Sequence, residues 1–201
     1  MNIPIISYIA LCGKCAYCKK PINFIYPFVE IACALLFLCN YLTFGFDMNF
    51  FISTIITCAL MVTIVSDFLY ISDRVLIISG IAIVITLFIF ETPEVVFKHI
   101  ISAAVIFIFM YLIKLIGNAI FRKESLGDGD IKLMGIVGLS IGIMNSLVSL
   151  FIASVVGLLF SFIITKKNKE GIIPFGPFLL IGALITLYFS DVITPFLQTY
   201  F

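Results

Sequence analysis

The hydrophobic positions of the chain fall into long unbroken runs separated by short polar stretches. A membrane-crossing helix needs about 20 consecutive apolar residues, and most of these runs are close to that length. Residues 131–165 form one apolar stretch, which would overshoot a bilayer as a single straight helix, so we expect a break at Gly142–Asn145. The predicted membrane helices then cover residues 24–46, 50–66, 75–90, 100–120, 131–144, 146–165 and 178–197.

The composition agrees with this pattern. Apolar residues make up 63% of the chain and charged residues only 11%, whereas a soluble globular domain is about half apolar and about a quarter charged. This excludes a soluble enzyme, a disordered tail and a nucleic-acid-binding protein. Only helices pair all their backbone groups inside lipid at this composition. The sequence therefore predicts an all-α, polytopic integral membrane protein with roughly six to seven transmembrane helices.

The basic residues indicate how the helices are oriented. Most of the twelve lysines and arginines precede the first run or lie in alternate connections, and the other connections contain only Lys98. Lys114 lies inside the fourth run. Because basic residues are retained on the cytoplasmic side, we expect the N-terminus in the cytoplasm and the C-terminus outside. The residues on the predicted cytoplasmic side are Lys14, Lys19, Lys20, Arg74, Arg122, Lys123, Lys132, Lys166, Lys167 and Lys169.

Two acidic clusters fall on that cytoplasmic side. Asp67 and Asp73 follow the second run, and Asp128 and Asp130 precede the fifth. Two carboxylates held close together share a proton, so one acts as a base while the other acts as an acid on water. The spacing alone fits equally well an interpretation in which Asp67 and Asp130 only end helices in water. A calcium site at Asp128 and Asp130 is disfavoured, because no further ligands follow at the spacing of an EF-hand.

Other polar residues have structural interpretations. Glu30 lies at the start of the first run, where a carboxylate is costly unless it is paired, so we expect an ion pair. We place His99, the single histidine, in an outer connection without a specific role. Cys15 and Cys18 supply two of the four thiolates of a closed zinc site, so we expect two reduced thiols and no metal.

Four segments match, in order, the motifs of one family. Gly127-Asp128-Gly129-Asp130, followed by Ile131-Lys132-Leu133, resembles the GxGD-x-K-L signature of type IV prepilin peptidases, and the wording of the motifs is most similar to competence-type enzymes. The other matches are the CxxCxxxI and YPxVE segments at residues 15–22 and 26–30, the first aspartate motif at 66–74, and the PFGPFL motif at 173–178.

The resemblance implies a GxGD-type intramembrane aspartyl protease. Such an enzyme cuts the short basic leader from type IV prepilins or pseudopilins, after a glycine, at the cytoplasmic face of the bacterial cytoplasmic membrane. The catalytic aspartates of the family carry over to Asp67 and Asp130, which would activate a water molecule. Residues that would shape the site are Gly127, Asp128, Gly129, Lys132, Asp73, Pro174 and Gly176.

The resemblance also implies the partners and cofactors. The substrate would be a membrane-inserted prepilin or pseudopilin precursor, no nucleic acid is expected, and proteolysis would need no cofactor. Many bacterial members also methylate the new N-terminus with S-adenosylmethionine. Methylation stays open here, because the start of the chain resembles only the later part of the family's cytoplasmic loop. We expect residues 1–23 to form a short cytoplasmic segment with the CxxC pair, and residues 24–201 to form the transmembrane peptidase domain.

The sequence departs from the family pattern near its first aspartate. Asp67 and Asp73 enclose five residues where the family usually has seven, and Ser72 stands where proline is usual. We prefer Asp67 because it directly follows the second run, and Asp73 remains the alternative. The short loop and the short N-terminal match also suggest an alternative interpretation, in which the chain is a catalytically inactive relative of the family. An ion-coupled transporter is a further alternative, and it predicts acids near the bilayer midplane.

Overall fold

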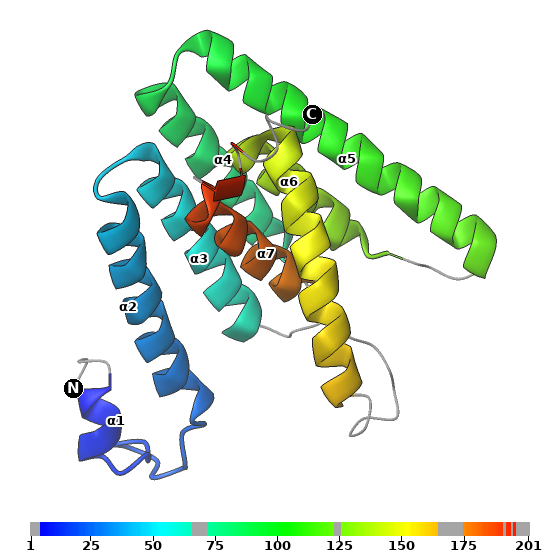
Figure 1. Cartoon of the computed structure of the whole chain (residues 1–201). Helices are drawn as coiled ribbons and strands as arrows, with labels where there is room; N and C mark the ends of the chain where they lie inside the picture. The colour runs from blue at the N-terminus through cyan, green and yellow to red at the C-terminus, as the bar shows by residue number, and fades with distance from the viewer. Residues whose placement is uncertain are drawn as a thin grey trace.

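The structure is a computed structural model that describes residues 5–65, 72–122, 126–164 and 175–190, together with residues 192, 193 and 195. The regular structure of these residues is helical, apart from one isolated bridge between Lys14 and Pro21. Figure 1 shows the helices as a bundle with the N-terminal segment at its edge. The helices are α1 (Ile6–Ala10), α2 (Ile25–Phe44), α3 (Met48–Val65), α4 (Asp73–Phe90), α5 (Pro93–Phe121), α6 (Asp128–Ile164) and α7 (Gly176–Tyr188).

Five of the helices, α2 to α6, are long and apolar enough to cross a membrane, and α7 is a shorter apolar helix. Large apolar side chains cover their outer surfaces, and Leu42, Ile89 and Phe151 are each about 70% exposed (72%, 71% and 70%). Water would not tolerate so large an apolar surface, whereas lipid solvates it. The predicted all-α, multi-pass membrane architecture is therefore confirmed.

The predicted break in the long apolar stretch is confirmed at Gly142. This residue has φ 77° and ψ 175°, which are not helical values, inside the element counted as α6. A positive φ of this size favours glycine, because a side chain there would meet the backbone. In Figure 1 the yellow-green first half and the yellow second half of α6 leave the break in different directions. The two halves therefore act as two separate helices.

His99 lies inside α5 and contacts the last turn of α6 before this break, so its predicted position in an outer connection is wrong. The helix starts earlier than the apolar run because Pro93 occupies its first turn, where proline is well tolerated. Two side chains bond to carbonyl oxygens at and near the break. His99 Nδ1 lies 2.8 Å from the Leu139 carbonyl oxygen, and the Ser146 hydroxyl donates to the Gly142 carbonyl oxygen at 2.5 Å.

Small and polar residues hold the bundle together. A Cβ added to Gly138 of α6 would lie 3.0 Å from the Ser102 carbonyl oxygen of α5, so the two backbones are in close contact there. Small residues permit such close packing between membrane helices. In addition, the fully buried Asn40 of α2 donates to the Thr57 hydroxyl of α3 at 3.3 Å and accepts from the Tyr188 hydroxyl. This network ties α2 to both α3 and the end of α7.

Glu30 of α2 contacts the N-terminal segment. Its Oε2 atom accepts a hydrogen bond from the Ile5 backbone N–H at 3.0 Å. The sequence predicts an ion pair for Glu30, and among the described residues its carboxylate makes this backbone hydrogen bond and no ion pair. Glu30 therefore fixes the start of α1 against α2.

Candidate active site

The first turn of α6 carries three charged side chains that point to two sides of the helix. Asp128 and Lys132 are four residues apart and so share one face, whereas Asp130 projects from the opposite face. The carbonyl oxygen of Gly127 accepts from the Ile131 N–H at 3.4 Å, which joins the glycine to this turn. The helical spacing therefore places the Asp130 side chain on a different face from its charged neighbours Asp128 and Lys132.

Two ion pairs tie that shared face to the adjacent helices. Lys114 of α5 pairs with the Asp128 carboxylate, and Lys132 Nζ lies 2.7 Å from Oδ1 of Asp73 at the start of α4. These contacts bring the end of α5 and the beginnings of α4 and α6 to one end of the bundle. This is the end that the distribution of basic residues predicts to face the cytoplasm.

Asp130 takes part in neither ion pair and is partly buried. A Cβ built on Gly127 would lie in van der Waals contact with Asp130, 3.4 Å from its Oδ2 atom, so the glycine directly adjoins this carboxylate. Glycine leaves one side of the carboxylate open. A water molecule or a peptide backbone can therefore approach the carboxylate from that side.

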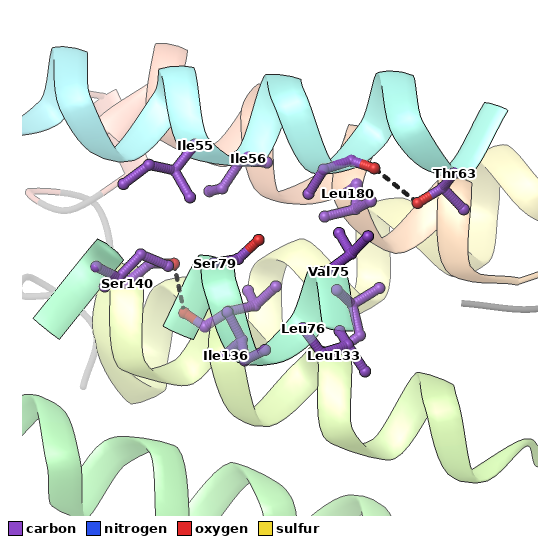
Figure 2. A pocket seen from close by; sticks show the side chains of 13 residues that line it. Ile55, Ile56, Thr63, Val75, Leu76, Ser79, Leu133, Ile136, Ser140 and Leu180 are labelled. Atoms are coloured by element: carbon purple, nitrogen blue, oxygen red, sulfur yellow. Dashed lines mark hydrogen bonds between the residues drawn. The ribbon is translucent and has the colours of Figure 1, made fainter. Parts of the chain in front are cut away.

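The face of α6 that carries Asp130 continues into the interior of the bundle. Val137 lies two turns further along it, and Figure 2 shows the α3, α4, α6 and α7 side chains that surround a small cavity there. Its volume is about 10 Å³, which is close to the space one water molecule needs. The Thr63 hydroxyl at its edge donates to the Ala59 carbonyl oxygen at 2.7 Å. Asp130 thus stands at one end of the packed core of the protein.

The structure brings together most of the residues that the sequence predicts for the site. Gly127 to Lys132 form one turn, and Asp73 joins them through Lys132. Lys132 was predicted either to orient Asp130 or to face lipid headgroups, and its Nζ atom donates a hydrogen bond to Asp73 Oδ1. Gly176 is buried at the start of α7. Asp67 and Pro174 lie outside the described residues.

The sequence interpretation missed the partner of Lys114. This lysine is only 15% exposed and pairs with Asp128 across the α5–α6 interface. A signal was present, because a lysine inside an apolar run is costly unless an acid or water compensates it. The partner could not be identified from the sequence, since several acids lie at the same predicted membrane depth.

The two cysteines of the CxxC pair are free thiols on a turn closed by the Lys14–Pro21 bridge. The pKa of the Cys15 thiol is lowered, because the backbone N–H groups of Cys18 and Tyr17 donate hydrogen bonds to its sulfur. Within the described ranges, no three histidine, cysteine or acidic side chains gather into a set that could hold a metal ion.

The Lys132–Asp73 pair is expected to contribute little to stability. Its side chains are 48% and 54% exposed, and exposed ion pairs typically contribute about 0–1 kcal/mol. Lys132→Gln should therefore lower the free energy of unfolding by less than about 1 kcal/mol, as followed by circular dichroism in detergent. Asp73→Asn is the matched variant. The double variant should lose no more free energy of unfolding than either single variant does. A loss of about 3 kcal/mol or more would indicate a buried pair and contradict this expectation.

Comparison with known proteins gives consistent matches along the chain. The family model described as "Bacterial Peptidase A24 N-terminal domain" matches residues 1–44, and the one described as "Type IV leader peptidase family" matches residues 52–162. The second match alone covers more than half of the chain and includes the whole first turn of α6.

Individual relatives agree with the family models. The chain is 31% identical to a prepilin leader peptidase/N-methyltransferase of Stutzerimonas stutzeri, over 96% of this chain and 68% of that relative. It is 32% identical to the protein of that name from Pseudomonas aeruginosa, over the same shares. The protein of that name from Bacillus subtilis is 26% identical, over 96% of this chain and 78% of its own length. No solved structure gives a significant match.

Proposed function

Because the chain belongs to the type IV leader peptidase family, we propose that it is an intramembrane aspartyl endopeptidase that removes the N-terminal leader from type IV prepilin or pseudopilin precursors. The observation that carries the proposal is the environment of Asp130. This carboxylate is partly buried in the first turn of a membrane helix, is open beside Gly127, and stays apart from the two neighbouring ion pairs.

The proposed mechanism uses two aspartates and one water molecule. Asp130 and Asp67 would share a proton, so that the ionised carboxylate takes a proton from water while its protonated partner supports the developing charge on the scissile carbonyl oxygen. A site at the end of the bundle admits water, which a site at the bilayer midplane would lack. The distribution of basic residues supports a cytoplasmic location for this end.

The Lys132–Asp73 contact supports Asp67 over Asp73 as the first catalytic residue. Asp73 is exposed, and its Oδ1 atom lies 2.7 Å from Lys132 Nζ, so this carboxylate is already paired with another side chain. Such a group is poorly suited to share a proton with Asp130. Lys132 also lies on the face of α6 opposite to Asp130, so Asp73 is drawn away from it.

The names of the relatives also include an N-methyltransferase, which implies S-adenosylmethionine as the methyl donor. The described residues do not fit that group. The two described cavities are lined by almost wholly apolar surface and offer few partners for a charged nucleoside. Cys15 and Cys18 supply only two of the four ligands of a closed zinc site. We therefore propose the peptidase activity, which needs no cofactor.

The location of the acids disfavours the transporter alternative. Asp73, Asp128 and Asp130 all lie in the first turn of their helices, at one end of the bundle. A carrier that couples ions to transport places such groups near the bilayer midplane, where discontinuous helices meet. The break at Gly142 is such a discontinuity, but none of these acids is near it in the chain.

Cleavage by the purified chain tests the proposal. A prepilin-like substrate incubated with the protein in detergent should lose its leader, and mass spectrometry should locate the new N-terminus directly after a glycine. A substrate with a bulky residue in place of that glycine is the control and should stay intact. No cleavage by a folded preparation would contradict the proposal and favour the catalytically inactive relative.

A further inference from the structure

A groove opens sideways between α4 and α5, with α6 as its floor. Its volume is about 580 Å³, which lies within the range of roughly 300–1,000 Å³ typical of ligand pockets. The lining is apolar except at one end, which the Asp73–Lys132 ion pair occupies. The α4 wall includes Ile77, the α5 wall includes Ala103 and Phe107, and the floor includes Gly135.

The groove is open toward the surrounding lipid. Ile77 is 61% exposed and Phe107 is 42% exposed, and both belong to helices long and apolar enough to cross the bilayer. An empty groove would forfeit dispersion contacts along its whole lining, and water would find few hydrogen-bond partners there. Its occupant is therefore apolar and enters from the bilayer.

We propose that this groove receives the apolar membrane helix of the prepilin substrate. The inference rests on the proposed function, because it assigns a docking surface to the same enzyme. The groove ends at the helical turn that carries the proposed active site, because Lys132 lines the groove and belongs to the same turn as Asp130. A helix that lies in the groove therefore ends beside the turn that carries the catalytic carboxylate.

The floor of the groove suits a helix. Gly135 is buried against α5 and has no side chain, and Ala103 beside it has only a methyl group, so neither position projects a large side chain into the groove. A Cβ at Gly135 would make ordinary contacts of 3.5–3.6 Å with Phe107, which shows that the glycine is not needed for the packing of α5 against α6. At Gly138, by contrast, that packing leaves no room.

The end of the groove is polar where such a substrate would leave the membrane. The half-exposed Asp73–Lys132 ion pair lies at this end, beside the expected position of the basic leader. Asp130 is on the opposite face of α6, so the segment between leader and helix must cross the first turn of α6, where Gly127 and Gly129 present no side chains. A helix is about 10 Å across and an extended chain advances about 3.4 Å per residue, so about three extended residues make that crossing.

Two matched pairs of positions test the assignment. Phe107 and Phe109 are 42% and 41% exposed on α5, and Ile77 and Ile78 are 61% and 67% exposed on α4, but only Phe107 and Ile77 line the groove. A photoreactive benzoylphenylalanine is placed at each position in turn, in the full chain with Asp130→Asn, so that a membrane-inserted prepilin-like substrate stays uncut.

Cross-links to the substrate should be several-fold more abundant from positions 107 and 77 than from 109 and 78, and excess unlabelled substrate should remove the difference. Equal yields from all four positions would overturn the groove assignment, as would cross-links from 107 and 77 to phospholipid alone. Cleavage by the unsubstituted chain is measured beside them. Equal yields with normal cleavage refute the groove only, whereas absence of cleavage refutes the proposed function.

A kinetic comparison tests substrate docking in the groove without the photoreactive group. Ile77→Trp places a larger side chain in the groove and should raise KM about tenfold with kcat nearly unchanged, because it obstructs docking and not chemistry. Ile78→Trp, on the lipid side of the same helix, should leave both constants within about twofold. A rise in KM that is the same for both variants would overturn the assignment.

Discussion

Replacing Asp130 by asparagine is expected to abolish leader removal while the protein stays folded in the membrane. Asparagine keeps the shape of the side chain but can neither accept nor release the proton that activates water. General acid–base catalysis contributes about 10²–10⁴-fold, so the rate should fall by about 10³-fold or more, to the limit of detection. Initial cleavage rates of a prepilin-like substrate, at matched amounts of folded protein, measure the effect.

Asp128→Asn is the matched control for this result. Asp128 lies two residues earlier in the same turn, is 76% exposed, projects from the opposite face of α6 and pairs with Lys114. Its substitution removes an equal charge from the same turn, and kcat should stay within a few-fold of the original value. Equal losses in both variants would indicate a general effect of charge on the turn. Full activity of Asp130→Asn would contradict the assignment outright.

Gly182→Ala is expected to have the largest effect on stability. A Cβ at this position in α7 would overlap the Ser149 carbonyl oxygen of α6 and lie 3.1 Å from the Ala153 backbone nitrogen. Both are backbone atoms, so α7 can accommodate the methyl group only by moving away from α6. Overpacking of this kind costs about 1–3 kcal/mol, and more where the backbone cannot yield. Thermal unfolding followed by circular dichroism in detergent should show a lower midpoint.

Gly157→Ala provides the comparison at the same interface. A Cβ there would lie 3.6 Å from the rings of Phe175 and Phe178, which is ordinary van der Waals contact. Alanine in place of glycine also favours a helix by up to about 1 kcal/mol, so this variant should be as stable as the original protein or slightly more stable. Equal unfolding midpoints for the two alanine variants would show that the close contact at Gly182 does not limit the packing.

The membrane helices could be predicted from the sequence because one physical constraint dominates them. Lipid offers no hydrogen-bond partners, so a long apolar run must be helical whatever its neighbours are. The break at Gly142 followed from length alone, since an apolar run of 35 residues (131–165) exceeds the thickness of a bilayer. The start of α5 at Pro93 was missed, because the polar residues that follow Pro93 lie outside the apolar run that defined the predicted helix. The proline itself was a signal, since proline is well tolerated in the first turn of a helix.

The residues of the candidate site were predictable only where they are local. Asp128, Asp130 and Lys132 share a turn, and the period of the helix already separates Asp130 from the other two. The pairs that position this turn join residues 14 and 59 positions apart, and such contacts depend on how α4 and α5 pack against α6. The groove could not be foreseen for the same reason. The role of Asp67 stays a prediction, because it lies outside the described residues.

The proposed catalytic pair of Asp67 and Asp130 is tested most directly by comparing Asp67→Asn with Asp73→Asn, beside Asp130→Asn. Leader removal is measured for all three at equal amounts of folded, membrane-inserted protein. Asp67→Asn and Asp130→Asn should both be inactive, and Asp73→Asn should keep its kcat within a few-fold, because Asp73 is engaged by Lys132. Activity retained in Asp67→Asn but lost in Asp73→Asn would contradict the pair and move the first aspartate to the start of α4.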